Sequence, residues 1–569
     1  MRLLWLWACG AALCCASSPV KVWVVLRDKG PLAVSGSLAG RALEDAPVYA
    51  PYMSQLRQAG FTPDVSLKWQ NLVSGWVDSA KIAGLSGLPM VRRVEIVPHR
   101  KTPYIRTSRT PVKAGNALSK AAAISASPAS PTYGPFQQLF DTTQASALGA
   151  AVAAAGEVPG QGLRIAVIDA NFRLGNEAFA HLWQDSQIVD QWDFNHNLPV
   201  AAYDTVALDA DSGHGAAVMS ILAAQSGSLQ GLVPAAKYLL YIAQNIDTEY
   251  YSEEDWVAAA IERAVDSGAQ VINISLADRY DYSYPPNDTA SDDTDYSVPY
   301  SEMNGRTRPS SLAALGAAER GVLVSVAMGN EGPMYYGPNG PTIGPTISAP
   351  ADADSILSVG ILDMTLCPCS YTSTGPTADG RIKPELSSIG PVSLSGSTRP
   401  RVCSYASSDF CETPTVDPTA VSGTLDQGGT SFAAPLVAGI AALLRQLHPS
   451  TSAQTIRLAL MATASQTLHP DSAAGYGLVR AADANRILTS NSTAEGAFAW
   501  ERNSPDYERW QPGLNFSTIR LWDLSGRRVS VQAQTNPNAP IFGIVPNPGG
   551  GSGVYVWRVS PLPDTSSAP

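Results

Sequence analysis

The chain is short of charge, of cysteine and of long apolar runs. Only 15% of its 569 residues are charged, and its formal net charge of −11 argues against a nucleic-acid partner. Beyond the N-terminus, no apolar stretch reaches the ~20 residues of a membrane span without meeting a charge or a proline. The hydrophobic content of 45% suits a globular protein, and the length predicts two to four domains.

The one long apolar run opens the chain. Arg2 is followed by the apolar stretch Leu3–Cys15 and then by small residues. This is the anatomy of a secretory signal peptide over residues 1–18, with cleavage after Ala16 or Ser18. The alternative is a membrane anchor, which is disfavoured because the run is too short to span a bilayer. We therefore expect an exported protein, secreted or at the cell surface, that has no membrane association after cleavage.

Three of the seven cysteines lie in that peptide, which leaves four: Cys367, Cys369, Cys403 and Cys411. An even number in an exported chain favours disulfides, and four cysteines allow three connectivities. Cys367 and Cys369 are too close in sequence to pair comfortably, so we expect each to bridge to Cys403 or Cys411. Metal binding is the weaker alternative, because no histidine lies near them.

Composition changes divide the rest of the chain. Residues 19–100 mix strand patterns with helical spacing, which predicts a small α+β domain. Residues 101–135 are rich in Ser, Ala and Pro and cannot bury a face, so they predict an exposed linker open to proteolysis. Residues 495–569 have strand patterns on both sides of a Pro/Asn/Gly-rich break and predict a β-sandwich-like C-terminal domain.

The intervening residues, 136–490, alternate apolar strands with helices. Strands such as "LRIAVIDA" and "GVLVSVAMGN" are continuously apolar, which predicts an α/β fold with a parallel sheet covered by helices on both faces. Ligand sites in such sheets lie at the carboxyl ends of the strands. The acidic, aromatic stretch between Asp278 and Arg308 has no core pattern and predicts a long surface loop.

Four polar residues stand at strand ends or helix starts in this part. Asp169 closes one strand, Asn330 ends another, His214 lies between two glycines, and Ser431 begins an apolar helix. Each is ambiguous alone, because Asp can start a turn and Ser can cap a helix. Together they supply a nucleophile, a base, a residue to orient the base, and a donor for an oxyanion.

The blocks "IAVIDA", "GHGAAVMSILA", "AMGNEG" and "GGTSFAAPLVAGIAALL" resemble the signatures of the subtilisin-like serine proteases (subtilases, peptidase S8 family). The resemblance covers about residues 160–485 and implies a three-layer, doubly wound sheet and an endopeptidase. It implies that His214 is the general base for Ser431, that Asp169 orients His214, and that Asn330 donates to the oxyanion. It implies no cofactor for catalysis.

The flanking units carry resemblances of their own. The first unit resembles the inhibitory propeptide of these enzymes, and "SLKWQNLVSGW" and "DYSVPYSEMNG" are similar to segments of exported subtilases from Bacteroidetes-type bacteria. The C-terminal "IRLWDLSGRRV" and "GVYVW" resemble, more weakly, a secretion-sorting domain. The implied protein is a self-inhibited precursor that acts on polypeptides and is cut within Lys101–Tyr133; the alternative is a permanent N-terminal domain.

The segment "SLAD" departs from the family's Ser-x-Gly-Gly, in a strand that pairs with the substrate. The resemblance assigns substrate binding to Ser275, Leu276, Ala277 and Gly329. The methyl group of Ala277 and the charge of Asp278 predict a pocket for small or basic side chains. Three other departures remove no catalytic atom: Ala216, Met328 and Phe432 replace the usual Thr, small residue and Met.

Two other interpretations compete with an active protease. A catalytically dead binding module on the same fold would lack a member of the set, and all four residues are present. An α/β-hydrolase esterase requires Ser before His and a Gly-x-Ser-x-Gly elbow, whereas Ala433 stands two residues after Ser431.

Structural calcium is common in subtilases, and the acidic loop offers oxygen ligands at Asp292, Asp293 and Asp295. Acidic runs in loops are more often simply solvated, so these residues are candidates and no metal site is assigned.

Overall fold

The computed structural model describes residues 19–31, 40–97, 133–208, 213–227, 229–245, 253–276, 299–337, 340–390, 392–393, 411–422 and 424–491, with four short strands between 521 and 557. The chain divides into two compact units, Met1–His99 and Arg100–Pro569. The predicted signal peptide and most of the predicted linker lie outside the described residues.

The first unit is built on a four-stranded antiparallel sheet of order β2-β3-β1-β4. Valines and Leu26 on one face of β1 form a core with Leu56 and Phe61, and two helices, α3 and α4, contact this sheet. Proline in the first turn favours the start of α3, and Gly60, with φ of 87°, follows its end. The bounds are β1 Pro19–Leu26, β2 Thr62–Leu67, β3 Leu72–Asp78, β4 Val91–Ile96, α2 Arg41–Glu44, α3 Ala50–Gln58 and α4 Ile82–Ser86.

The second unit contains a seven-stranded, wholly parallel sheet of order β17-β16-β13-β12-β5-β11-β7. Its strands are β5 Arg164–Asp169, β7 Ile188–Asp193, β11 Lys237–Ile242, β12 Val271–Ile274, β13 Leu323–Ala327, β16 Leu357–Leu362 and β17 Leu386–Ile389. After β5 the chain first builds the β11 side of the sheet and then crosses to the β12 side. The carboxyl end of β5 is therefore a topological switch point, where ligand sites form in such sheets.

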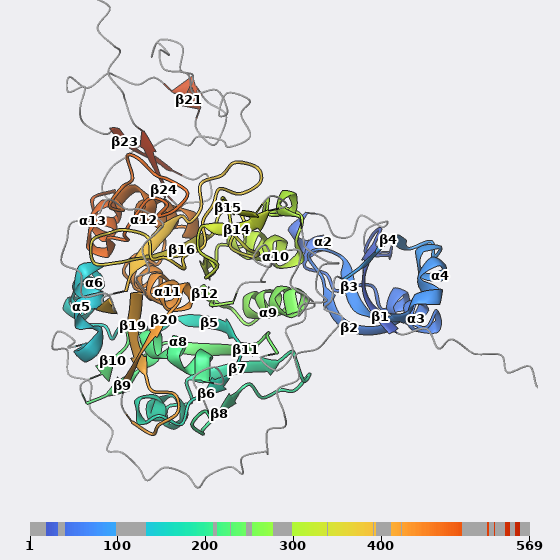
Figure 1. Cartoon of the computed structure of the whole chain (residues 1–569), viewed down its shortest axis with the longest axis horizontal. Helices are drawn as coiled ribbons and strands as arrows, with labels where there is room; N and C mark the ends of the chain where they lie inside the picture. The colour runs from blue at the N-terminus through green and yellow to red at the C-terminus, as the bar shows by residue number, and fades with distance from the viewer. Residues whose placement is uncertain are drawn as a thin grey trace, which may run out of the picture. The chain divides into compact units, whose positions relative to one another are not determined.

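Helices cover both faces of this sheet, as the sequence predicts. Ile165 and Val167 of β5 belong to the core formed with α8 and α11, whereas the alternate residues Ala166 and Ile168 are buried outside that cluster. Figure 1 shows α11 and α9 on opposite sides of β12. The helices are α5 Gln137–Thr142, α6 Ala145–Ala154, α7 Ala180–Gln184, α8 His214–Ala223, α9 Glu253–Asp266, α10 Pro309–Glu319, α11 Thr430–Leu447, α12 Ala453–Thr463 and α13 Ala481–Asn491.

Helix α11 has the length and composition of a membrane span, but 83% of it is buried inside the protein. It contacts β12, β13, β16 and β17 and is the central helix of the core. The sequence predicts that Ser431 begins this helix; the structure begins it one residue earlier, at Thr430, with Pro435 inside it.

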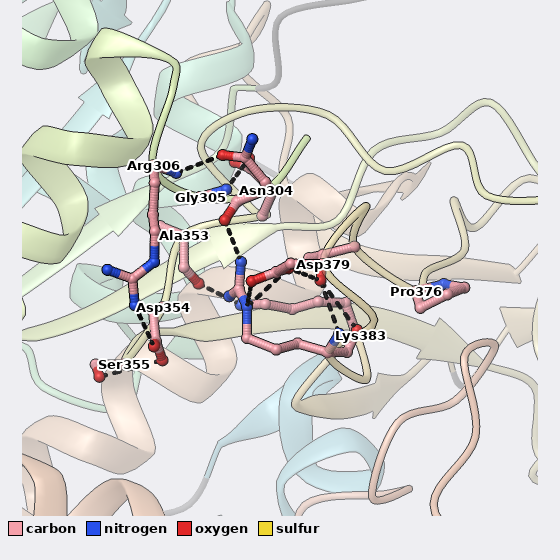
Figure 2. Close-up of polar contacts among 12 residues, drawn as sticks. Asn304, Gly305, Arg306, Ala353, Asp354, Ser355, Pro376, Asp379 and Lys383 are labelled. Atoms are coloured by element: carbon pink, nitrogen blue, oxygen red, sulfur yellow. Dashed lines mark hydrogen bonds and ion pairs between the residues drawn. The ribbon is translucent and has the colours of Figure 1, made fainter. Parts of the chain in front are cut away.

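The prediction of a surface loop up to Arg308 is wrong at its C-terminal end. Met303 is fully buried, and the buried Arg308 pairs with Glu254 of α9 and lies 3.0 Å from Glu302. Figure 2 shows how the neighbouring turn is fixed: Arg306 reaches toward Asp354, and the backbone carbonyl of Asn304 accepts a hydrogen bond from Arg381 at 2.7 Å. Pairing between segments distant in sequence therefore buries a stretch whose local pattern is polar.

Smaller antiparallel pairs complete the second unit. They are β9 Gln225–Ser226 with β10 Leu229–Gln230, β14 Met334–Gly337 with β15 Gly340–Ile343, and the sheet of β18 Val392–Ser393, β19 Cys411–Val416 and β20 Thr424–Gly428. A parallel pair joins β6 Phe172–Arg173 to β8 Ala202–Tyr203. Near the C-terminus, β21 Leu521–Trp522 pairs with β22 Arg528–Val529, and β23 Ile541–Pro546 pairs with β24 Ser552–Trp557. The β-sandwich-like domain over 495–569 stays a prediction.

Candidate active site

A buried carboxylate and a half-buried imidazole meet at the switch point. Asp169 is the last residue of β5 and is fully buried, and its Oδ1 lies 2.7 Å from Nδ1 of His214. The N–H of Ala170 donates to the same carboxylate oxygen at 2.7 Å, which fixes its orientation. Because Nδ1 of His214 faces Asp169, a proton exchanged between this imidazole and a third group would pass through the other ring nitrogen, Nε2.

The approach of α8 to β5 depends on the glycine that follows His214. A Cβ on Gly215 would lie 1.9 Å from the carbonyl oxygen of Asn171, which no side chain can tolerate. The first turn of α8 therefore packs directly on the segment after β5. This close approach brings the first residue of the helix, His214, within reach of Asp169.

Ser431 lies in the first turn of α11, and its two neighbours in the chain contact Asn330 and His214. The residue before it, Thr430, donates its N–H to Oδ1 of Asn330 at 2.8 Å. The ring of the residue after it, Phe432, lies 5.6 Å from the imidazole of His214, centroid to centroid. Gly429, with φ of 143°, lets the chain turn into the helix, and the helix N-terminus favours negative charge beside it.

The contacts of Asn330 determine which end of its amide is available. Its Oδ1 accepts the N–H of Thr430 and lies 3.0 Å from the Thr430 hydroxyl, so the amide oxygen is occupied. Its Nδ2 lies on the side of Gly429, 3.5 Å from where a Cβ on that residue would be. Asn330 is an exposed residue three positions beyond the end of β13, so the strand is shorter than the sequence indicated. The amide N–H₂ group can therefore meet an anion beside Ser431.

A proline inside α11 leaves the carbonyl of Ser431 without its helical partner. Pro435 has no N–H to donate four residues back, and the hydroxyl of Ser275 donates to this oxygen instead, at 2.8 Å. Nδ2 of Asn273 in turn donates to the Ser275 hydroxyl at 2.9 Å, and the Ser431 hydroxyl donates to the Ser275 carbonyl at 3.2 Å. Ser275, which follows β12 and is held by Asn273 of that strand, therefore fixes the first turn of α11.

The four residues assigned to substrate binding differ in burial and in the contacts that they make. Ser275 is buried with its side chain on Ser431, and Leu276 follows it with 8% exposed. The N–H of Gly329 donates to the Thr430 hydroxyl at 3.2 Å, so it is already used within the protein. Ala277 lies outside the described residues, and substrate binding by all four stays a prediction.

The predicted disulfides and the candidate calcium ligands can be tested only in part. Cys367 and Cys369 are both disulfide-bonded, and Cys403 lies outside the described residues, so the pairing stays a prediction. The calcium candidates, Asp292, Asp293 and Asp295, also lie outside them. Within the part of the chain that the structure describes, no group of three or more His, Cys, Asp or Glu residues could hold a metal.

Sequence reasoning missed the residues that support the site. Asn273 and Tyr371 carry no pattern of their own, and Thr430, although it lies in a signature block, shows its role only through its contact with Asn330. Pro435 was a usable signal, because a proline in the second turn of an apolar helix always leaves a carbonyl that needs another donor. Phe432 was noted as a departure, and its contact with His214 now explains its place.

Comparison with known proteins agrees with this geometry. Residues 160–477 match the subtilase family (peptidase S8), and residues 39–113 match the peptidase S8 propeptide domain of Bacteroidota. Subtilisin from Bacillus pumilus is 26% identical over 257 residues, which are 45% of this chain and 70% of that protein. Subtilisin E from Bacillus subtilis is also 26% identical over 257 residues, and the match spans only 51% of its length.

Among solved structures, fervidolysin from Fervidobacterium pennivorans has the same fold, with a TM-score of 0.50 and 17% sequence identity. The match covers 95% of this chain and 68% of fervidolysin, which is described as a keratinolytic enzyme related to subtilisin. The family match extends over more than half of the chain and contains every residue of the candidate site. The chain therefore belongs to the subtilase family of serine endopeptidases, and it carries the propeptide of a precursor.

Proposed function

We propose that this protein hydrolyses peptide bonds with Ser431 as nucleophile, His214 as general base and Asp169 as the residue that orients the base. The observation that carries the proposal is the 2.7 Å contact between Asp169 and Nδ1 of His214, made beside the first turn of α11. The Ser431 oxygen bonds to the substrate carbonyl carbon while its proton passes to Nε2. The imidazolium then gives this proton to the leaving amine, and water repeats the sequence to release the acid.

Asn330 is the proposed side-chain donor to the oxyanion, together with the N–H of Ser431. Its amide oxygen is already bound by Thr430, which supports a role for Nδ2 as the donor that meets developing negative charge. The positive end of α11 acts in the same direction. Loss of a donor of this kind lowers kcat about 10²–10³-fold in subtilisin itself, from which this expectation is taken.

A serine-directed fluorophosphonate probe tests the nucleophile. We expect the processed protein to be labelled once, at Ser431, and Ser431→Ala to be unlabelled and inactive on casein. The matched control is Ser387→Ala, in β17 and away from the proposed site. It removes a buried hydroxyl that donates to the carbonyl of Ala474, and the variant should be labelled normally. An unlabelled wild-type protein would instead support the catalytically dead binding module.

We further propose that the precursor comprises a signal peptide (1–18), an inhibitory propeptide (19–100), a linker (101–135), the catalytic domain (136–490) and a C-terminal domain (495–569) with a sorting role. Export before activation would protect the producing cell. Wild-type protein should be cut within Lys101–Tyr133, and Ser431→Ala should accumulate with that linker intact. N-terminal sequencing checks this, and a mature wild-type N-terminus at Val20 would contradict it.

The proposed substrates are polypeptides with small or basic side chains next to the scissile bond. The proposal rests on the sequence "SLAD", in which Ala277 and Asp278 supply a methyl group and a negative charge where the family has two glycines. A peptide-library profile should show these preferences, and a profile led by bulky aromatic residues would contradict them.

A further inference from the structure

A short segment after the disulfide-bonded cysteines contacts both sides of the proposed site. The phenol oxygen of Tyr371 accepts the N–H of Gly429 at 3.1 Å, two residues before Ser431. The backbone carbonyl of Tyr371 accepts the N–H of Gly332 at 2.7 Å, two residues after Asn330. One residue therefore links the turn that leads into the nucleophile to the loop that carries the oxyanion donor.

Ser373, two residues further along, fixes that loop on both sides of Asn330. Its N–H donates to the carbonyl of Gly329 at 3.1 Å. Its hydroxyl accepts the N–H of Glu331 at 3.1 Å and donates to the Glu331 carboxylate. The residues before and after Asn330 are thus both held by Ser373, while the amide oxygen of Asn330 is held by Thr430.

The segment is itself fixed to the sheet. The N–H of Cys369 donates to the carbonyl of Ile361 in β16 at 3.0 Å, and the N–H of Thr372 donates to the carbonyl of Cys369 at 3.0 Å. Cys369 is only 3% exposed and is disulfide-bonded. At its other end, the N–H of Thr374 donates to the Thr346 hydroxyl at 3.0 Å. Tyr371 and Ser373 therefore project from an anchored support.

We infer that Tyr371 and Ser373 are positioning residues that hold Asn330 and the turn before Ser431 at a fixed separation, an inference that rests on the proposed function. Oxyanion donors are effective because they are already in place when charge develops, and a displacement of about 1 Å can cost about 10²-fold in rate. Asn330 is exposed and lies in a loop beyond β13, so its own strand does not supply this rigidity. The bonds from Tyr371 and Ser373 supply it.

The test measures kcat and KM of the processed protein on a peptide substrate for Tyr371→Phe and Ser373→Ala. Each variant removes one hydroxyl and should lower kcat about 3- to 10-fold with KM unchanged within about twofold, because the lost interaction acts on the transition state. The matched control is Tyr238→Phe, which removes a buried tyrosine hydroxyl bonded to Val233 at 2.9 Å near the start of β11. It should leave kcat unchanged.

A second arm separates positioning from a merely structural role. In an Asn330→Ala background, Ser373→Ala should cost less than about twofold, because the donor that Ser373 positions is absent. The same fold loss in both backgrounds, or a rise in KM at constant kcat, would overturn the inference while leaving the proposed function intact. If Asn330→Ala alone kept wild-type kcat, the proposed oxyanion role would fail, and this inference with it.

Discussion

The imidazole of His214 packs against the ring of Phe432, with the centroids 5.6 Å apart and the ring planes at 47°. Phe432 is 2% exposed and is the residue after Ser431, so one aromatic ring joins the proposed base to the helix of the proposed nucleophile. The ring limits how far the imidazole can turn while Asp169 holds its Nδ1.

Truncation of the Phe432 ring should therefore let the imidazole of His214 turn away from its catalytic orientation. We expect Phe432→Ala to lower kcat about tenfold with little change in KM, and Phe432→Met to stay within about threefold because a long side chain still fills the space. Phe140→Ala removes an equally buried ring from α5 and should reduce thermal stability while preserving kcat. Steady-state kinetics distinguish these outcomes; equal kcat losses in Phe432→Ala and Phe140→Ala would refute the role of the ring.

A buried ion cluster ties α12 to the sheet. Glu385 accepts from Lys383 at 2.8 Å and from Arg457 of α12 at 3.0 Å, and the Ser358 hydroxyl also donates to it. Burial alone would raise the pKa of Glu385, but the two cations hold it below its ordinary value; burial lowers the pKa of Lys383 to about 8. The carboxylate therefore stays charged throughout the neutral range.

The two ends of this cluster should respond unequally to mutation. Glu385→Gln leaves two buried cations without their anion and should cost about 3–5 kcal/mol of unfolding free energy. Lys383→Met keeps the Glu385–Arg457 pair and should cost much less. Urea unfolding measures the free energy of unfolding of both variants, made in the inactive Ser431→Ala chain to prevent self-digestion. A larger loss for Lys383→Met than for Glu385→Gln would contradict the prediction.

Acid should destabilise the catalytic unit through His181. Burial lowers the pKa of this imidazole on α7 from 6.5 to about 4. Between these values the unfolded chain binds a proton and the folded chain does not, so stability falls as pH falls from 6.5 toward 4. Both proteins are compared in the Ser431→Ala background. As the pH falls from 7.5 to 4.5, the free energy of unfolding should drop by about 2 kcal/mol less in His181→Leu than in its parent. If the free energy of unfolding changed with pH by the same amount in both proteins, protonation of His181 would not contribute to acid destabilisation.

The four mature cysteines should yield no free thiol. Because Cys367 and Cys369 are both disulfide-bonded and only two residues apart, we expect each to pair with Cys403 or Cys411. Mass spectrometry of a non-reduced digest should show two bridges that join the segment near residue 368 to the segment near residue 407. A direct Cys367–Cys369 bridge would contradict this pairing.

The sheet could be predicted from sequence because its signal is local. A run such as that of β5 is apolar at every position, and only a strand covered on both faces needs such a run. Asp169 could be singled out because it closes such a strand, and His214 because it lies between two glycines at the start of a helix. Their catalytic roles, with those of Asn330 and Ser431, remain predictions.

The supporting contacts could not be predicted, because they join residues far apart in the chain. Tyr371 meets Gly429 across 58 positions, and Asn330 meets Thr430 across 100. Met303 belongs to a polar stretch and is nevertheless fully buried, which hydrophobic periodicity cannot reveal. Local pattern thus identifies the residues that carry chemistry, and tertiary structure selects the residues that hold them.

Pro435 has a consequence for how the site forms. A helix that contains this proline cannot complete its first turn alone, because the carbonyl of Ser431 finds its donor in Ser275, the residue that follows β12. The shape around the nucleophile therefore depends on assembly of the sheet and not on local helix formation. A newly made or partly unfolded chain should have α-helix in this segment before it has a reactive serine, so reactivity reports the docking of α11 against β12.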